Sequence, residues 1–297
     1  MSKIICYGAI LWDIYPDNRF IGGAPFNLCG HLSKLGNETY MITGVGEDEL
    51  GQSAREQIEK IDVKSDYVYI DPNHPTGTAQ VTLDEKGVPT YYLPDGVAYQ
   101  YIELTDKQLA SIKAGAFDMI CFGTLEMKGS KSCETIHQLL ELCSFGEVFV
   151  DINIRLDFHP IEIIQYAISQ ATILKLNKNE TILISGLLYN NRNEEECIRS
   201  LFAEYQKLHC ICVTKGPLGC TTFTRTQHID MNECRSDAVD TVGAGDAFSA
   251  GFINSYLATR DYYISTKRAS ILSDFVASKH GAIPDYDNLL QMRFDQL

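Results

Sequence analysis

The residues best suited to chemistry form the stretch 240–248, which reads Asp-Thr-Val-Gly-Ala-Gly-Asp-Ala-Phe. Gly243, Ala244 and Gly245 are small enough for their backbone N–H groups to approach a ligand closely, and the apolar residues that follow predict a buried helix. The amino end of such a helix attracts an anion. Asp246 would repel that anion unless its carboxylate takes a proton beside it, so we predict a general base there. The alternative is that Asp246 only stabilises the first helical turn.

Polar side chains directly follow several short apolar runs that resemble strands. In an open parallel sheet, ligands bind outside the carboxyl ends of the strands, so we expect these residues to meet at one site. The set consists of Asp13, Asp151, Asn153, Arg155, Asn177, Glu180 and the stretch 214–216. Each of them alone is more typical of a solvated loop, but the same coincidence recurs at several strand ends.

Two familiar nucleotide-binding patterns are absent from the sequence. The Gly-x-Gly pairs at 243–245 and 44–46 are followed by Phe248 and Glu49, where a dinucleotide fingerprint has its third glycine. No Gly-Lys dipeptide occurs, so a P-loop is excluded as well. The sequence therefore supports neither a Rossmann dehydrogenase nor a Walker-type kinase.

The elements that must position these residues alternate between apolar runs and amphipathic helical stretches. Strands are predicted at 4–8, 39–44, 118–123, 147–152, 172–176 and 210–214. This alternation is typical of a three-layer α/β fold, with a mostly parallel central sheet and helices on both faces. A helix is predicted to begin near Pro25, to carry Leu28, Leu32 and Leu35 on one face, and to end at Gly36.

The region 76–94 departs from this pattern. Its two strand-like pieces flank the glycine-containing turn 84–87 and predict a hairpin. A further strand-like piece at 11–21 is expected to join that hairpin in a small sheet. We therefore expect one domain over 1–297, with a lid subdomain formed by about 11–21 and 76–95.

The composition narrows the class of protein. The chain has 297 residues, 45% of them hydrophobic, and a formal net charge of −14, which predicts a globular protein without a nucleic-acid partner. No apolar run is long enough to span a membrane and the start lacks a signal-peptide pattern, so we expect a cytoplasmic protein with no membrane partner. The ten cysteines include no CxxC pair and are predicted to be free thiols, with Cys210 and Cys212 in a core strand.

These motifs resemble those of the ribokinase-like (pfkB) carbohydrate kinase family, and within it the fructokinases. The stretch 22–27, Gly-Gly-Ala-Pro-Phe-Asn, together with Gly36 resembles the amino-terminal signature of the family, and 240–248 is similar to its carboxy-terminal signature. The segments 46–51, 151–155, 175–180 and 214–219 are similar to family blocks in the expected order. The resemblance runs essentially from end to end and implies a ribokinase-like fold with a small β-sheet lid.

The resemblance implies transfer of a phosphoryl group from ATP to a sugar. Asp246 would take the proton of a primary hydroxyl group of the sugar. The backbone N–H groups of Gly243, Ala244 and Gly245 would stabilise charge on the transferred phosphoryl group, and Arg155 is the candidate cation.

The resemblance also implies binding roles. Glu180, with Asn177, would act on Mg²⁺ mostly through bound water, and Asp240 would lie near a monovalent cation such as K⁺. The implied nucleotide-side residues are Asn177, Glu180, Thr214, Gly216 and Gly219, and the implied sugar-side residues are Asp13, Gly22, Gly23, Asn27 and Arg155. Two simpler interpretations compete with these roles: Asn27 as a helix-start cap and Asp240 as a turn cap.

The expected activity is the ATP-dependent conversion of a ketohexose, D-fructose, to its 6-phosphate. The alternatives are a 2-keto-3-deoxygluconate kinase or another pfkB sugar kinase, and a catalytically silent sugar or nucleotide sensor on the same fold. The segment 97–101 departs from the family, because many fructokinases carry a Trp-Asp pair there. The exposed edges of the lid would allow a homodimer through it, although the sequence leaves the oligomeric state open.

Overall fold

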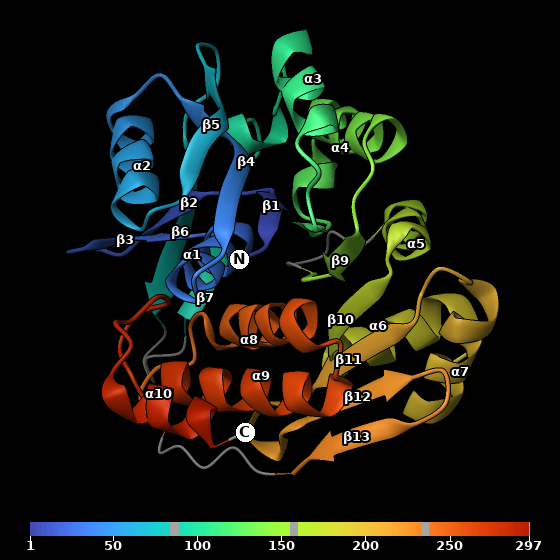
Figure 1. Cartoon of the computed structure of the whole chain (residues 1–297). Coiled ribbons are helices and arrows are strands. Elements are labelled where there is room, and N and C mark those ends of the chain that lie inside the picture. The colour runs from blue at the N-terminus through green and yellow to red at the C-terminus, as the bar shows by residue number, and fades with distance from the viewer. Residues whose placement is uncertain (84–88, 155–159, 233–237, 297) are drawn as a thin grey trace.

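The structure is a computed structural model that describes residues 1–83, 89–154, 160–232 and 238–296. Within these residues the main sheet has nine strands in the order β13-β12-β11-β10-β9-β8-β1-β4-β5 (Figure 1). The strands are β1 (Lys3–Tyr7), β4 (Glu38–Gly46), β5 (Lys64–Asp71), β8 (Met119–Phe122), β9 (Glu147–Asp151), β10 (Ile173–Asn177), β11 (Cys210–Thr214), β12 (Cys220–Thr224) and β13 (His228–Met231). The pairs from β5 to β11 are parallel, and β12 and β13 continue the sheet in antiparallel fashion.

Helices cover both faces of this sheet. On one face lie α1 (Ala24–Lys34), α2 (Glu49–Lys60), α8 (Ala244–Thr259), α9 (Tyr262–Ala277) and α10 (Asn288–Asp295). On the other face lie α3 (Asp106–Ala114), α4 (Ser130–Leu142), α5 (Ile161–Gln170), α6 (Lys178–Tyr189) and α7 (Glu194–Glu204). The three-layer α/β prediction is confirmed.

The alternation of side chains along the strands explains why two cores form. In β1, Ile4 and Cys6 pack into the core under α1 and α8, whereas Ile5 and Tyr7 pack into the opposite core. In β11, Cys210 and Cys212 face the first core as free thiols, and Ile211 faces the second. Cysteine thus acts here as a small buried apolar residue, as predicted.

All six predicted strands are present, with ends that differ from the prediction by at most two residues. Three strands of the main sheet were not predicted from the sequence: β5 forms one edge, and β12 and β13 lie at the other end, where β13 is the edge strand. Edge strands are partly exposed, so polar residues interrupt their apolar pattern, as in the alternately exposed β5.

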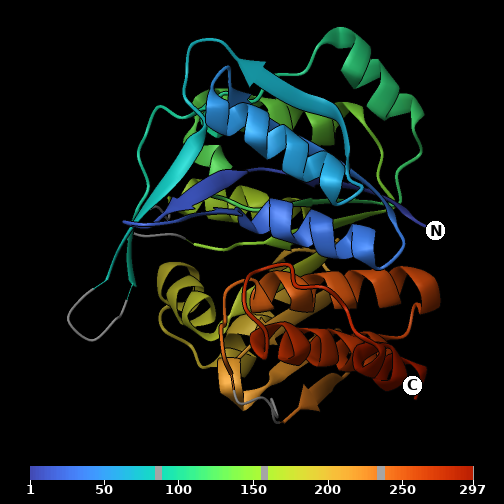
Figure 2. The same cartoon turned by 90° about the vertical axis from the view of Figure 1, so that its left-hand side faces the viewer.

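A second sheet projects from the body beside α1 and α2 (Figure 2). Its order is β3-β2-β6-β7, with β2 (Leu11–Ile14), β3 (Arg19–Gly22), β6 (Gly77–Leu83) and β7 (Pro89–Tyr92). The piece at 11–21, expected as one strand, forms two antiparallel strands, because Pro16 and Asn18 interrupt it with a turn. The 76–94 hairpin is confirmed in its two strands, and its turn 84–87 lies outside the described residues.

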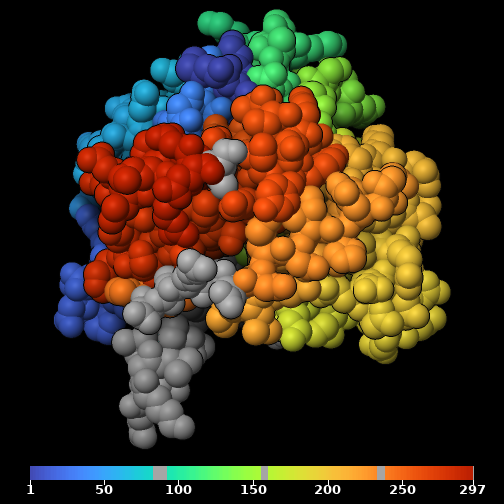
Figure 3. Space-filling model, turned by 60° about the horizontal axis from the view of Figure 1, so that its bottom comes forward, coloured from blue at the N-terminus to red at the C-terminus, as the bar shows by residue number. Residues whose placement is uncertain are grey.

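The space-filling view shows the red and orange C-terminal part of the chain in the middle of this face, next to the yellow segment (Figure 3). Among the described residues, no helix combines the length and the apolar character needed to cross a membrane.

Candidate active site

Helix α8 begins in a left-handed turn at Gly243, where φ is 78°. A Cβ atom at this position would lie 2.5 Å from the carbonyl oxygen of Ala282, so glycine is required both for the turn and for the packing. Asp246 stands in the first turn of the helix, which is buried on nearly all sides farther along, as predicted. The amino end of a buried helix and a carboxylate therefore meet at one point.

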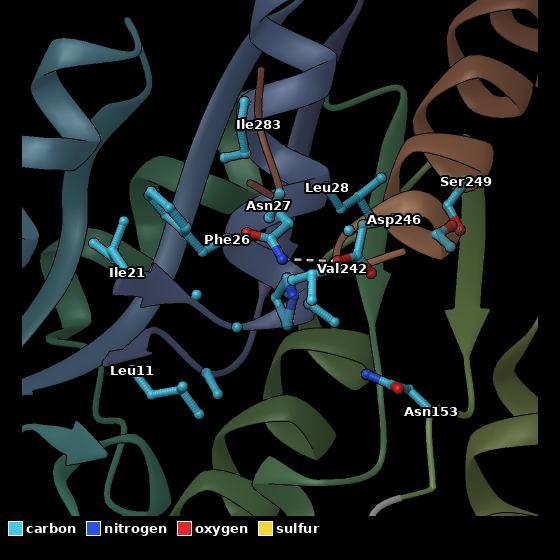
Figure 4. A pocket seen from close by; sticks show the side chains of 18 of the residues that line it. Leu11, Ile21, Phe26, Asn27, Leu28, Asn153, Val242, Asp246, Ser249 and Ile283 are labelled. Atoms are coloured by element: carbon cyan, nitrogen blue, oxygen red, sulfur yellow. Dashed lines mark hydrogen bonds between the residues drawn. The ribbon is translucent and has the colours of Figure 1, made fainter. Parts of the chain in front are cut away.

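Asn27 connects the amino-terminal motif to this carboxylate. Its side-chain Nδ2 donates a hydrogen bond of 2.8 Å to Oδ2 of Asp246 (Figure 4). Helix α1 begins at Ala24 after Gly23, which makes no side-chain cap, so the interpretation of Asn27 as a helix-start cap is wrong. Asn27 lies one turn farther along α1, and its amide orients the carboxylate across a sequence separation of 219 residues.

A cavity of about 1460 Å³ lies beside this contact. The predicted site residues in its wall are Asp13, Gly22, Gly23, Asn27, Asp151, Asn153, Asn177, Thr214, Asp240, Gly243, Gly245 and Asp246. Four predicted site residues are described by the structure but do not line this cavity: Ala244, Glu180, Gly216 and Gly219. Arg155 lies outside the described residues. The carboxyl ends of the parallel strands thus meet at one cavity, as the strand-end pattern predicts.

The small sheet supplies one side of the cavity. Asp13 lies on β2, and a Cβ atom on Gly22 of the neighbouring β3 would lie 3.0 Å from its Oδ2. Gly23 has φ 108°, and a Cβ atom there would lie 2.4 Å from the carbonyl oxygen of Ala9. The glycine pair therefore lets the backbone pass close to Asp13 and to the end of β1.

Asn177 and Glu180 hold the start of α6. The amide of Asn177 accepts a hydrogen bond of 2.9 Å from the N–H of Glu180, and the Glu180 carboxylate accepts one of 2.7 Å in return. The other Glu180 oxygen accepts from the N–H of Ile154 at 2.9 Å, next to the end of β9. Burial raises the pKa of Glu180, and the ammonium group of Lys175 counteracts part of this rise.

Asp240 acts as a turn cap in this structure. Its Oδ1 accepts from the N–H of Val242 at 3.0 Å, and its Oδ2 accepts from the N–H of Gly281 at 3.1 Å. The carboxylate thus joins the loop before α8 to the segment after α9. The simpler interpretation of Asp240 is confirmed, and the expected cation site near it stays a prediction.

A buried ion pair at the strand ends escaped the sequence analysis. The ammonium group of Lys175 on β10 donates to Oδ2 of Asp151 on β9 at 2.8 Å. A Cβ atom on Gly245 would lie 3.4 Å from the Lys175 nitrogen, so this cation adjoins the amino end of α8. Burial disfavours the charged form, but the nearby carboxylates of Asp151 and Glu180 outweigh it and raise the pKa of Lys175.

The sequence did carry a signal for this pair. Lys175 stands within the apolar strand Ile-Leu-Lys-Leu-Asn, and a lysine buried there needs a carboxylate partner.

Glu126 is a second residue of the cavity wall that was not predicted from the sequence, and it begins the short helix η2 (Glu126–Lys128) after β8. Its carboxyl is buried, and its Oε1 has no hydrogen-bond partner within the described part of the chain.

Comparison with known proteins decides the family. The model of the pfkB family carbohydrate kinases matches residues 5–289 of the chain. The chain belongs to the pfkB family of carbohydrate kinases. A fructokinase of Salmonella typhimurium is 28% identical over 270 residues, which are 86% of this chain and 85% of the relative.

Solved structures agree on the fold of this pfkB kinase. A fructokinase from Xylella fastidiosa with bound ATP superposes with a TM-score of 0.82 at 19% identity and covers 95% of this chain and 94% of its own. A fructokinase from Vibrio cholerae with fructose, ADP and calcium bound gives 0.78 at 22% identity, with 95% of both chains covered. The ribokinase-like fold expected from the motifs is thereby confirmed.

Proposed function

We propose that this sugar kinase transfers the γ-phosphoryl group of ATP to the primary hydroxyl group of a ketohexose, converting D-fructose to fructose 6-phosphate. The contact between Asn27 and Asp246 supports the proposal most directly. It joins the sugar-side motif to the carboxylate at the amino end of α8, inside one cavity. Several of the matched relatives are named fructokinases, which favours fructose over other sugars.

In the proposed reaction, Asp246 accepts the proton of the sugar hydroxyl group, and the hydroxyl oxygen then forms a bond to the γ-phosphorus. The bond from the γ-phosphorus to the bridging oxygen breaks, and ADP leaves with that electron pair. The amide of Asn27 holds the carboxylate at 2.8 Å, which fixes the direction of proton transfer. The backbone N–H groups of residues 243–245 stabilise the charge on the moving phosphoryl group.

Lys175 is the cation that the described residues place beside this amino end. We propose that it neutralises phosphoryl charge, in addition to the role expected for Arg155. The ion pair with Asp151 holds the ammonium group in one position, and preorganised charge is most effective in a buried site.

Asn177 lines the cavity, and the two Glu180 oxygens already accept backbone N–H groups, so these residues suit an ion that keeps its water and arrives with the nucleotide. Within the described residues, no three His, Cys, Asp or Glu side chains gather closely enough to hold an ion by themselves. Mg²⁺ is usually held by one or two carboxylates, water and substrate phosphates, and the proposed partners are Glu180 and Asn177 through water. The bound ion would supply charge neutralisation on the phosphate oxygens.

The remaining roles are proposals of the same kind. Asp13, Gly22 and Gly23 bind sugar hydroxyl groups, and the small sheet closes over the sugar as a lid. Thr214, Gly216 and Gly219 bracket the nucleotide, and K⁺ near Asp240 orders the two loops that this carboxylate joins.

A substrate panel tests the proposed function. Purified protein with Mg-ATP would be assayed for ADP release with fructose, ribose, glucose, adenosine, 2-keto-3-deoxygluconate and fructose 6-phosphate. We expect the highest kcat/KM with fructose, because a site that hydrogen-bonds each hydroxyl group rejects sugars that lack or invert one. Preference for 2-keto-3-deoxygluconate would replace fructose with the acid sugar. Binding of sugar without any turnover would instead indicate a sensor.

A further inference from the structure

The small sheet is attached to the body at the start of helix α2. Asp48 precedes this helix, and its Oδ1 accepts a hydrogen bond of 2.7 Å from the N–H of Gly51. Thr76, the residue before strand β6, donates two bonds to the same carboxylate: its N–H reaches Oδ2 at 2.8 Å and its hydroxyl group reaches Oδ1 at 2.6 Å. Burial alone would raise the pKa of Asp48, but these bonds outweigh it and lower the pKa, so a charged acceptor joins the helix to the strand.

The hydroxyl group of Thr76 extends this attachment to the end of β4. Its oxygen accepts a bond of 2.9 Å from the N–H of Gly46, and the whole residue is buried. A Cβ atom on Gly46 would lie 2.6 Å from Oδ2 of Asp48, and one on Gly51 would lie 2.1 Å from the carbonyl oxygen of Gly46. Together, Gly46, Asp48, Gly51 and Thr76 form a tightly packed joint between the small sheet and the body.

The first turn of α2 also holds the other side of the small sheet. The indole Nε1 of Trp12 on β2 donates a bond of 3.1 Å to the carbonyl oxygen of Leu50. Arg19 on β3 lies over the Trp12 ring at 5.4 Å and pairs with Glu49 at 3.5 Å. Since β2 also pairs with β6, three neighbouring strands of the small sheet are attached at this one turn.

The joint acts on the cavity through these strands. Asp13 follows Trp12 on β2, and Asp13 and Ala79 of β6 line the cavity, whereas Asp48 and Thr76 do not. Rotation of the small sheet about the joint would carry Asp13 toward the sugar side of the cavity or away from it (Figure 2). A change in the joint would therefore reach the sugar without any direct contact to it.

We propose that Asp48 and Thr76 are positioning residues that form the fixed pivot of the lid and hold Asp13 in place for the sugar. The kinetic consequence of this inference rests on the proposed sugar-kinase function, whereas the pivot itself is a property of the protein without substrate. The strands of the small sheet move about the first turn of α2 while the joint stays bonded. Loss of the joint should weaken sugar binding more than ATP binding, because the implied nucleotide-side residues lie on other elements.

The first test removes one hydroxyl group from the joint. Thr76→Val keeps the shape of the side chain but leaves Asp48 with one bond fewer and the N–H of Gly46 without its acceptor. We expect KM for fructose to rise about tenfold, while kcat and KM for ATP stay within about twofold of the wild type. Thr76→Ser keeps the hydroxyl group and should restore most of the sugar affinity. An unchanged KM for fructose in Thr76→Val would overturn the proposal.

A matched control lies at the opposite end of the main sheet. The hydroxyl group of Thr172 likewise donates to a carboxylate, that of Glu147, at 2.6 Å and accepts from a backbone N–H, that of Val148, at 3.0 Å. Thr172→Val should lower the stability of the protein but leave KM for fructose unchanged. An equal rise of KM in both variants would mean that Thr76 contributes only to general stability.

The fluorescence of Trp12 tests the pivot without an enzymatic assay. Trp12 is the only tryptophan of the chain, and its indole is bonded to the turn that holds the joint. Thr76→Val should shift the emission to longer wavelength and increase quenching by acrylamide, because the small sheet is held less firmly over the indole. Unchanged emission and quenching would contradict the pivot. Absence of turnover by the wild type would contradict the proposed function and leave this result intact.

Hydrogen exchange of the wild type covers the case in which Thr76→Val fails to fold. The N–H groups of Gly46, Gly51 and Thr76 should exchange slowly both in the free protein and with fructose and ADP, because the joint stays bonded in both states. The N–H groups of β2 and β6 should gain protection when the two ligands are added. Fast exchange at the joint in the free protein, or an equal gain of protection at the joint and in β2, would contradict a fixed pivot.

Discussion

At the residue scale, the site depends on two charged groups near Gly245, the carboxylate of Asp246 and the ammonium group of Lys175. Asp246 is oriented by the amide of Asn27, and Lys175 is held by Asp151. A base and a cation in fixed positions suit phosphoryl transfer. The base takes the proton of the hydroxyl group, and the cation neutralises negative charge on the transferred phosphoryl group. The two groups lie in different elements and have different hydrogen-bond partners, although the charge of Asp246 also contributes to the raised pKa of Lys175.

Asp246→Asn should keep the fold and sugar binding but lower kcat by about 10² to 10⁴-fold, the usual range for a lost general base. Asparagine is nearly isosteric with aspartate, so the helix start and the packing around Gly243 should survive. Steady-state kinetics and fructose titration by calorimetry would separate the two effects. A kcat close to that of the wild type would remove Asp246 from the role of base.

Lys175→Met should both destabilise the protein and slow phosphoryl transfer. It leaves Asp151 as a buried carboxylate without a counter-charge, which costs roughly 3 kcal/mol in the free energy of unfolding. The double variant with Asp151→Asn should recover most of this stability, as measured by urea unfolding, while kcat stays low. Recovery of kcat together with stability would mean that the lysine serves folding alone.

At the element scale, helix α1 connects the two sides of the site. Asn27, His31 and Lys34 share one face of the helix, at spacings of four and three residues. The ring of His31 bonds to the carbonyl oxygen of Ala282 at 2.9 Å and to the hydroxyl group of Tyr286 at 2.7 Å. Ala282 in turn packs against Gly243, so α1 holds the segment that covers the start of α8.

The chemistry of these bonds fixes the protonation of His31. A carbonyl oxygen only accepts, so Nε2 carries the hydrogen, and in a neutral ring Nδ1 then accepts from the hydroxyl group of Tyr286. Burial lowers the pKa of His31 to about 4, which favours this neutral ring. Because the unfolded chain takes up the proton near pH 6.5, the contribution of His31 to stability decreases as the pH falls from about 6.5 to about 4.

His31→Leu should lower kcat and raise KM for ATP, because Ala282 would no longer be held against Gly243. We expect about a tenfold loss in kcat/KM for ATP, corresponding to about 1.4 kcal/mol for the lost hydrogen bonds. His31→Gln should restore part of the activity, since its amide can donate to one partner and accept from the other. Lys107→Met, an exposed lysine of α3 on the other face of the sheet, is the control and should leave kcat/KM for ATP unchanged. No rescue by glutamine would leave only a packing role.

At the scale of the whole molecule, a second charge cluster lies at the opposite end of the sheet from the cavity. Glu147 at the start of β9 accepts hydrogen bonds from Thr172 at 2.6 Å, from His209 at 3.1 Å and from Arg260 at 2.6 Å. These residues come from the loop before β10, the loop before β11 and the end of α8. Burial raises the pKa of Glu147, but the hydrogen bonds outweigh it and hold the pKa at about 2.

Glu147→Gln should lower the free energy of unfolding at pH 7 by about 2 kcal/mol. The pKa of Glu147 is lower in the folded state than in the unfolded state, so its stabilisation is complete above about pH 4.5 and is lost toward pH 2. Urea unfolding at pH 7 and at pH 3 should therefore show a smaller difference between variant and wild type at the lower pH. Glu141→Gln on α4 is an exposed control, and an equal difference at both pH values would speak against the linkage.

The sequence by itself determined the fold class, the central strands and the motifs at their carboxyl ends. Buried strands follow from local apolar runs, and glycine turns follow from backbone sterics. Both can therefore be predicted from the order of the residues. The edge strand β5 escaped because one face of an edge strand is solvated and its pattern is broken. The split of 11–21 into β2 and β3 was missed although Pro16 and Asn18 mark its turn.

Only the tertiary structure decided which of the polar residues act on one another. Asn27 and Asp246 are 219 positions apart in the sequence, so no local pattern indicates their contact, and the partner of Lys175 lies on a neighbouring strand. The buried position of the Glu126 carboxyl depends on the space left by Gly8, more than a hundred residues earlier in the chain. Such pairings arise when strand ends distant in sequence meet at one edge of a sheet, and burial then sets the charge of each group.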